Sequence, residues 1–422
     1  MRLSNNLMYQ NNINKILDNQ QGVANAQERV TTGEKYLTTS EAPAAISQAM
    51  LYSNKIQTNE QYTKNINQLN GRLETEESVL QSINSNIQQA QELTIQAGNG
   101  VYTKDDLKTF ASELSGIQQT LANLMNTRSE DGKFIFSGYQ DSTQPYQLES
   151  GEYNYKGDQG QHQITIAEGV SIKASDNGFD TFEKTDARLN VLDNKADIPT
   201  TTPANNITKG TVYVDGQAEF DKFHQAQYNA DPATPVSPTA NTFSVVTTAG
   251  ATTNDPDTYE ILQDGMSLTP PQTGEVTDDT IEFAGMKIQF EGSAPGQLDF
   301  SLEKPHKENV LNTLQALITG LNNGALEGDD FQQVLADGLV QLQNASEQVV
   351  FTQASLGGRM NALERVSDSN LALDIQNKSN RSNLVEVDMA EAISELTKQE
   401  TALQASQATF GRLTNLSLFD YL

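Results

Sequence analysis

The chain has 422 residues, which is enough for two or three domains, and it contains no cysteine, so disulfides and zinc–thiolate sites are excluded. Only 36% of its residues are hydrophobic, and its formal net charge is −28. A surface this acidic repels nucleic acid and anionic lipid, and no run of about 18 apolar residues could span a bilayer. We therefore expect neither a nucleic-acid partner nor a membrane partner.

Proline divides the chain into helical arms and a non-helical middle. Eleven of the twelve prolines lie between Pro145 and Pro305, and the other is Pro43. Because proline breaks helix interiors, residues 44–132 and 306–422 are free to be helical and the middle is not. The middle segment 133–310 also carries 27 acidic residues against 11 basic ones, an excess that solubility explains most simply.

The first predicted element is a weak helix over residues 3–30. Its apolar stripe of Leu3, Ile13, Leu17 and Ala24 also holds glutamines at positions 10 and 20. Polar residues in such a stripe weaken a coiled coil but fix its register and partner number. The pattern predicts a helix that becomes firmly ordered when neighbours surround it.

A much longer helix is predicted over residues 43–97, with Pro43 in its first turn, where a missing N–H costs little. Apolar residues follow alternating steps of four and three, which is a heptad stripe interrupted by one charged residue, at Leu69, Leu73, Glu76, Leu80, Ile83, Ile87, Ala90, Thr94 and Ala97. This helix would be about 80 Å long at 1.5 Å per residue and needs partners. Residues 104–129 are predicted to return as a second helix.

The middle of the chain changes to alternation with period two, which is typical of strands. Short strands separated by Gly and Asp turns are predicted at 133–139, 153–157, 163–166 and 170–173. After a linker-like stretch rich in Thr, Pro and Asn, further strands are predicted at 210–214, 243–246, 259–262, 281–283, 286–290 and 298–302.

The C-terminal arm repeats the heptad pattern from Leu335 to Leu373, and a further stripe runs from Met389 to Phe410. Helical seams on both sides of a β-rich insert require the two ends of the chain to meet. We therefore predict an α+β fold: a long antiparallel helical bundle or coiled coil from both termini with inserted β-rich domains. The predicted segments are 1–42 (terminal helix), 43–132 (helical hairpin), 133–197 and 198–305 (β-rich), 306–380 (returning bundle helices) and 381–422 (terminal helix).

No pattern of catalytic or metal-binding residues is visible. The three histidines, His162, His224 and His306, are far apart in turn-rich sequence, whereas zinc ligands usually cluster at short spacing. The acidic pairs at 105–106, 278–279 and 329–330 do not fit a calcium loop, and the first follows Thr103 at a helix start, where capping explains it better. We expect no enzyme activity and no cofactor.

The apolar stripes have two possible roles. For residues 44–132 and 335–380, the core of one monomeric bundle is the better interpretation. The stripes near the two termini are too polar for a stable two-helix unit and suit a multichain lattice. The predicted assembly interface consists of Leu3, Leu7, Ile13, Leu17, Ile393, Leu396, Leu403, Phe410, Leu413, Leu416 and Leu418.

Each arm carries a short motif, and the first is Ser40-Glu41-Ala42-Pro43. It is similar to the Ser-Asp-Asp-Pro motif of the flagellin-like family of bacterial axial proteins, with Glu41-Ala42 in place of the two Asp residues. The run from Leu356 to Glu364 resembles the family's Gly-x-Arg-x-Asn-x-Leu-Glu motif. We interpret its residues Gly357, Gly358, Arg359, Asn361 and Leu363 as a helix-packing motif, with the glycines allowing two helices to approach closely.

Within that family, residues 132–146, the Tyr155-Lys156-Gly157-Asp158 turn and the final residues 416–422 resemble members that join hook to filament. The resemblance implies a structural, extracellular subunit whose terminal helices line the inner tube of the flagellum. Implied partners are the preceding hook-associated junction protein, flagellin and copies of itself. It also implies type III export without a cleaved signal, with a chaperone on the C-terminal helices. Filament flagellin, or an adhesin carried on a helical stalk, are the alternatives.

Overall fold

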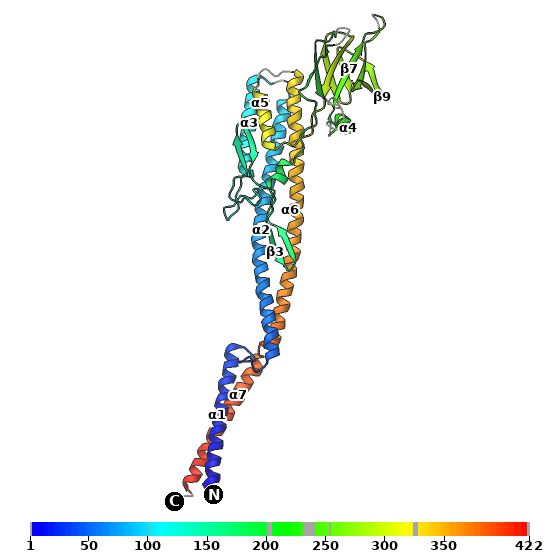
Figure 1. Cartoon of the computed structure of the whole chain (residues 1–422). Coiled ribbons are helices and arrows are strands. Elements are labelled where there is room, and N and C mark those ends of the chain that lie inside the picture. The colour runs from blue at the N-terminus through cyan, green and yellow to red at the C-terminus, as the bar shows by residue number, and fades with distance from the viewer. Residues whose placement is uncertain are drawn as a thin grey trace. The chain divides into compact units, whose positions relative to one another are not determined.

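A computed structural model of the chain describes residues 2–100, 102–200, 205–230, 241–252, 255–323 and 328–419, with side chains described from residue 7 to residue 412 within these ranges. The chain forms two compact units. Unit 1 contains residues 1–70, 164–172 and 360–422, and unit 2 contains residues 71–163 and 173–359. Long terminal helices with sheets between them confirm the predicted α+β class (Figure 1).

Unit 1 is built from helices and one hairpin. Helices α1 (Arg2–Thr32) and α7 (Met389–Phe419) lie side by side, and the unit also contains the first part of α2 (Pro43–Ala97) and the last part of α6 (Gly328–Val385) (Figure 1). Hairpin β3 (Gln163–Ala167) and β4 (Val170–Lys173) is held to these helices by side-chain amides. Asn65 Nδ2 donates to the carbonyl of Thr165, and Asn370 Nδ2 donates to that of Ile166, both at 2.7 Å.

The predicted apolar stripe of α2 is buried along its whole length. All nine residues from Leu69 to Ala97 on this stripe are less than 3% exposed, including the polar members Glu76 and Thr94. On α6 the matching seam buries Leu335, Leu342, Val349, Leu356 and Leu363 and continues to Asn370, but Leu373 is exposed. A heptad pattern therefore identified the core of the long helices, as far as Asn370.

Two shorter helices complete the bundle of unit 2, namely α3 (Lys104–Met125) and α5 (Val310–Asn322), which pack on one another. Helix α3 begins with a capping box. The backbone N of Asp106 donates to Thr103 Oγ1 at 3.3 Å, and the backbone N of Thr103 donates to Asp106 Oδ2 at 2.9 Å. The predicted capping role of this acidic pair is confirmed.

The charged residue in the seam has a defined role. Glu76 is fully buried, and its Oε1 accepts a hydrogen bond from the backbone N of Asp176 at 2.9 Å. Asp176 in turn forms an ion pair with Arg359 of α6. Burial, aided by the adjacent Asp176 carboxylate, raises the pKa of Glu76 to about 8. Glu76 is therefore mostly neutral at pH 7 and ties the loop after β4 to the two long helices.

Close helix–helix approach occurs at glycines other than the predicted ones. A Cβ added at Gly338 of α6 would lie 2.3 Å from the side chain of Leu317 in α5, and one at Gly320 would lie 2.6 Å from Val334. A Cβ at Gly357 or Gly358 would meet nothing within 4 Å. The packing role predicted for those two was wrong, because sequence spacing does not show which side of α6 faces a neighbouring helix.

Residues 133–139 do not form the predicted strand. Phe134, Ile135 and Phe136 are all buried, whereas successive side chains of a strand point to opposite faces. The segment is a turn-rich loop, and the carbonyl of Phe136 accepts hydrogen bonds from Gly178 N at 2.8 Å and Tyr155 Oη at 2.9 Å. It packs beside the hairpin of β1 (Tyr146–Glu149) and β2 (Glu152–Tyr155) and a short π-helix, η1 (Phe179–Glu183).

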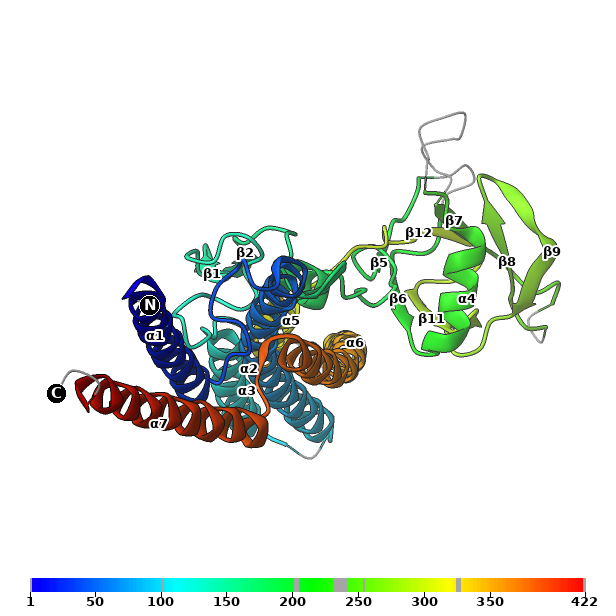
Figure 2. The ribbon, with the colours of Figure 1, turned by 90° about the horizontal axis from the view of Figure 1, so that it is seen from below.

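The outer part of unit 2 is a β domain with one helix. Its strands form two antiparallel four-stranded sheets in the orders β10-β11-β6-β5 and β12-β7-β8-β9. The bounds are β5 (Lys195–Ala196), β6 (Lys209–Val214), β7 (Thr242–Thr248), β8 (Thr258–Gln263), β9 (Met266–Glu275), β10 (Thr280–Phe283), β11 (Met286–Glu291) and β12 (Gly296–Ser301). Helix α4 (Gln217–Gln227) lies against the strands (Figure 2) and buries Phe220 in their common core.

Several boundaries differ from the predicted ones. Val191 belongs to the core of the outer domain, so this domain begins before the predicted position 198. Helix α6 continues past the predicted boundary at 380 and ends at Val385. Strands β1, β5 and β9 and helix α4 were not predicted, because they are short, polar or interrupted by proline and carry no clear periodicity.

The outer domain is attached to the N-terminal part of α6 by polar contacts. Arg188 Nη1 lies 2.6 Å from Asp337 Oδ1, and its Nη2 donates to the carbonyl of Val214 at 2.6 Å. The acidic pair at the start of α6 takes part as well. Lys287 Nζ lies 2.9 Å from Asp329 Oδ2, and Tyr213 Oη donates to Asp330 Oδ1 at 2.8 Å. These carboxylates thus help to fix the outer domain on α6.

The buried carboxyl group predicts a pH effect on stability. Between about pH 4.5 and 8, the folded chain binds a proton at Glu76 that the unfolded chain has lost, so the free energy of unfolding falls as pH rises. Glu76→Gln should remove a decline on the order of 4 kcal/mol, measured by urea unfolding across this range. The exposed neighbour provides the control: Glu77→Gln should unfold with the wild-type pH profile. A wild-type decline retained in Glu76→Gln would contradict the assignment.

The two kinds of glycine in α6 predict opposite effects. Gly338→Ala should destabilise the fold by about 1–3 kcal/mol, because Leu317 is buried and cannot move aside. Gly357→Ala should stabilise it by up to about 1 kcal/mol, because alanine favours a helix and meets no neighbour. Thermal unfolding of both variants gives the comparison, and equal effects would show that Gly338 is not a contact point.

Candidate assembly surface

The terminal helices α1 and α7 pair through polar residues, small residues and partly buried apolar ones. Asn19 Nδ2 donates to Ser406 Oγ at 2.7 Å and to the carbonyl of Ala402 at 3.3 Å. Further toward the free ends, the rings of Tyr9 and Phe410 lie 5.0 Å apart between centroids. Among the described side chains of these two helices, only Ala26 and Ala392 are buried, so the larger apolar side chains are covered only in part and the hydrophobic stabilisation is limited.

The other end of this helix pair is closed by backbone hydrogen bonds. Lys35 N donates to the carbonyl of Val385 at 2.7 Å, and Val387 N donates to that of Gly33 at 2.9 Å. Gly33 ends α1 with a φ of +72°, a conformation that favours glycine. This two-way bridge holds the C-terminal end of α1 beside the start of α7, although the two segments are about 350 residues apart in sequence.

The predicted interface residues fall into three groups. Leu7, Leu17 and Ile393 are 62%, 56% and 52% exposed, so each leaves more than half of its surface open to solvent within the described chain. The half-buried group, which lies between the two helices or at their margin, is Ile13, Leu396, Leu403 and Phe410. The side chains of Leu3, Leu413, Leu416 and Leu418 lie outside the described residues.

The pairing face of α1 differs from the predicted stripe. Ala24 is exposed, whereas Ala26 is buried and Asn19 bonds to α7. Ala392 is the buried counterpart on α7. Ile16 and Val23 lie three and four residues from Asn19 on the same side of the helix and are half-buried, so the pairing face is a partly apolar stripe next to the predicted one. The predicted stripe residues Leu17 and Ile393 lie instead on a solvent-exposed surface of the helix pair.

Large hydrophobic side chains are exposed more often in unit 1 than in unit 2. More than half of those exposed in the described chain belong to unit 1, among them Leu7, Met8, Tyr9, Leu17, Met50, Leu51, Val170, Leu371, Leu373, Ile375, Met389 and Ile393. The pair of terminal helices is also electrically balanced, since α1 carries three basic and two acidic residues and α7 carries two basic and three acidic ones. Such a surface can approach another copy without strong charge repulsion.

The motif at residues 357–363 serves the interior of the molecule. Leu363 is buried in the seam, Asn361 is exposed, and Arg359 forms the ion pair with Asp176 and lies 3.5 Å from the carbonyl of Lys173. Arg359 is therefore a residue of the buried cluster around Glu76. The sequence could not show this, because both of its carboxyl neighbours lie more than 180 residues away.

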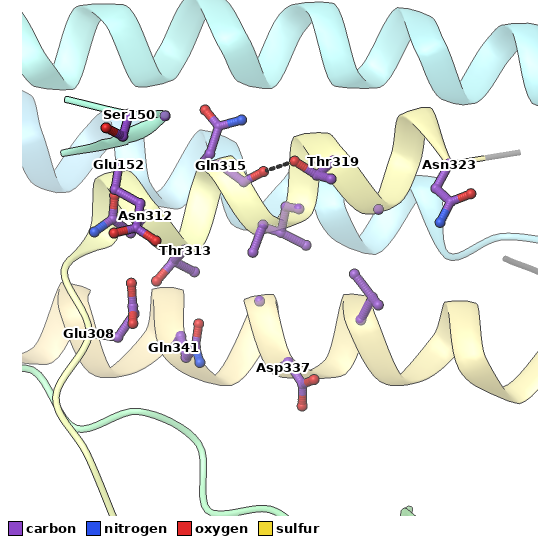
Figure 3. A pocket seen from close by; sticks show the side chains of 16 residues that line it. Ser150, Glu152, Glu308, Asn312, Thr313, Gln315, Thr319, Asn323, Asp337 and Gln341 are labelled. Carbon is purple, nitrogen blue, oxygen red and sulfur yellow. Dashed lines mark hydrogen bonds between the residues drawn. The ribbon is translucent and has the colours of Figure 1, made fainter. Parts of the chain in front are cut away.

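A cavity of about 790 Å³ lies between α5 and α6 (Figure 3). It presents Glu152, Glu308, Asn312, Asp337 and Gln341 beside aliphatic residues. Burial raises the pKa values of Glu308 and Asp337, although the ion pair with Arg188 opposes this at Asp337.

Among the described residues, no group of three or more His, Asp or Glu side chains is arranged to hold a metal ion. In the same part of the chain, no helix is long and apolar enough to cross a membrane.

Comparisons with known proteins agree with this architecture. Residues 3–141 match the bacterial flagellin N-terminal helical region, and residues 339–422 match the bacterial flagellin C-terminal helical region. The flagellar hook-associated protein 3 of Escherichia coli K12 is 36% identical over 153 residues, which cover 36% of this chain and 48% of that protein. Its counterpart in Salmonella typhimurium is 34% identical over 154 residues, with 36% and 49% covered. The chain thus spans about half the length of the curated relatives it matches.

Solved structures show the same fold. Flagellar hook-associated protein 3 of Legionella pneumophila matches with a TM-score of 0.57 at 20% identity, covering 79% of this chain and 98% of that one. FlgL of Xanthomonas campestris matches with a TM-score of 0.55 at 21% identity, covering 78% and 99%. The two flagellin regions together cover more than half of the chain, in the two arms that form its helices. The chain belongs to the flagellin-like family of bacterial flagellar proteins.

Proposed function

We propose that this chain is a structural subunit of the bacterial flagellum that joins hook to filament. The observation that carries the proposal is the surface of the terminal helices, which is electrically balanced and exposes apolar side chains such as Leu17 and Ile393. The two curated relatives that match at 34–36% identity are hook-associated proteins, which favours the junction over the filament.

Physical chemistry supports an assembling role for these ends. A two-helix pair in which Ala26 and Ala392 are the only buried side chains among those described covers too little apolar surface to be stable alone. Contact with further helices would cover Leu17 and Ile393 and contribute about 25 cal/mol for each Å² of apolar area removed from water. The neighbours would be copies of the chain, the preceding hook-associated junction protein and flagellin.

The proposal includes the route and the place of assembly. The subunit would be exported through the flagellum's own type III pathway, with a chaperone holding the C-terminal helices until assembly, and would act outside the cell. Exposed apolar residues on α7, such as Met389 and Ile393, are the kind of surface that a chaperone covers before assembly.

Filament flagellin is the second candidate, because the matching family regions are those of flagellin.

Deleting the gene distinguishes the two candidates. Loss of the junction should leave complete hooks, no filaments and flagellin released into the medium, because flagellin would be exported without a surface to polymerise on. Electron microscopy of the cells and immunoblotting of the culture supernatant measure these outcomes. Bare hooks without secreted flagellin would contradict the junction role.

Single substitutions test the terminal surface. Leu17→Ser should change the stability of the isolated chain by less than about 0.5 kcal/mol, because the side chain is exposed, yet it should sharply reduce recovery of the subunit in detached flagella. Asp18→Ser, on the next residue of α1 and also exposed, is the matched control and should assemble normally. Normal assembly of Leu17→Ser together with Ile393→Ser would contradict the proposed contact surface.

A further inference from the structure

One side of the α2/α6 helix pair in unit 1 carries a long groove. Cavities of about 910 and 450 Å³ adjoin along it, and Leu51 lines both of them. The groove is bounded by both helices and, at one end, by hairpin β3–β4. Leu51 of α2 and Leu373 of α6 are each 55% exposed within it.

The same groove holds two basic side chains that no carboxylate of the described residues neutralises, although Lys55 Nζ lies over the ring of Tyr52 at 5.8 Å from its centroid. Lys55 and Arg365 line it, are exposed, and make no ion pair within the described part of the chain. Glu168, at the hairpin, is its acidic lining residue. The groove therefore offers an apolar floor beside a small excess of positive charge.

The opposite side of the same helix pair carries a complementary ridge. Leu371 and Ile375 are each 61% exposed and lie two residues before and after Leu373, which corresponds to about 200° around a helix. They therefore point away from the groove, while the buried Asn370 faces α2 and donates through its amide to the hairpin.

Two acidic residues continue this ridge toward the N-terminus of α6. Glu364 and Asp368 precede Leu371 and Ile375 in steps of four, three and four, which places all of them on one side of the helix. Both carboxylates are exposed and make no ion pair within the described residues. The ridge is thus acidic at one end and apolar at the other.

Groove and ridge present these features in the same order along the helix axis. In the groove, the apolar Leu373 follows the basic Arg365 by about 12 Å, at 1.5 Å per residue. On the ridge, the midpoint between Leu371 and Ile375 follows Glu364 by nearly the same distance. If a second copy lies alongside at the same height, Glu364 on the ridge of one copy comes next to Arg365 in the groove of the other. The ridge residue Leu371 then comes next to the groove residue Leu373.

We propose that the ridge around Leu371 and Ile375 of one copy docks in the groove around Leu51 and Leu373 of the next copy. Because each copy has one groove and one ridge, the contact is head-to-tail and can repeat around a ring or a helical tube. The inference rests on the proposed function, in that it names the neighbour that unit 1 would meet in the junction.

Introduced cysteines test this contact directly, since the chain has none of its own. Leu51→Cys and Ile375→Cys combined in one full-length chain should yield a ladder of disulfide-linked multimers under mild oxidation. An equimolar mixture of the two single variants should stop at dimers, and each single variant alone should remain monomeric. Dimers from either single variant would reveal a two-fold contact and overturn the proposal.

The matched control shifts one cysteine by a single residue. Gln376 is exposed on α6 but lies about 100° around the helix from Ile375, so Leu51→Cys with Gln376→Cys should give no ladder. A ladder of equal yield from this pair would overturn the proposal. Circular dichroism of each variant establishes that the helices are retained.

Charge reversal gives a second measurement. Glu364→Arg or Arg365→Glu, added to the Leu51→Cys/Ile375→Cys chain, should reduce the ladder, and the two reversals together should restore it. Adjacent residues of one helix do not face each other, so restoration must come from contact between copies. Failure of the double reversal to restore the ladder would contradict the assigned register.

The cross-linking is run on concentrated full-length chain and on detached flagella. Subunits present in flagella without a ladder would overturn the docking and leave the junction role standing. A ladder from the concentrated chain, with no subunit found in flagella, would overturn the junction role and support the docking.

Discussion

Burial of one continuous seam along α2 and α6 is the constraint on which the rest of this fold depends. The two helices come from opposite ends of the chain, and contacts such as the hydrogen bond from Asn59 Nδ2 to the carbonyl of Asn370 join residues 311 positions apart. Neither helix could bury its stripe alone. The chain between them must therefore leave and return at the same end of the bundle, which makes the β-rich segments insertions in a helical frame.

Polar groups inside the seam restrict how the helices can slide along each other. Ser346 Oγ donates to Asn84 Oδ1 at 2.7 Å, and Asn370 connects α2 with hairpin β3–β4. The cluster of Glu76, Asp176 and Arg359 adds a charged contact that can form in only one register of the two helices. Apolar residues alone would tolerate shifts by a heptad, whereas an unpaired buried polar group costs free energy. We infer that these groups specify the register of the bundle.

Charge and apolar exposure are distributed to different parts of the chain. The segment 133–310, which includes the outer β domain, holds most of the excess of acidic residues, while α1 and α7 together are neutral and expose apolar side chains. Like charges repel and keep a surface solvated, and a neutral apolar surface favours association. One chain thus combines an end whose surface favours association with a domain whose charge opposes it.

The sequence by itself determined the long helices, their seam and the β-rich nature of the insert. Heptad spacing reports one helix face directly, and proline placement marks where helices cannot continue. The tertiary structure alone decided the partners of particular residues, because contact across hundreds of positions leaves no local pattern. Glu76 interrupts the apolar stripe in the sequence. In the structure its buried carboxyl group accepts a hydrogen bond from the backbone N of Asp176. Gly357 looked like a packing glycine, yet Gly338 has that role, since only the placement of α5 shows which face of α6 is covered.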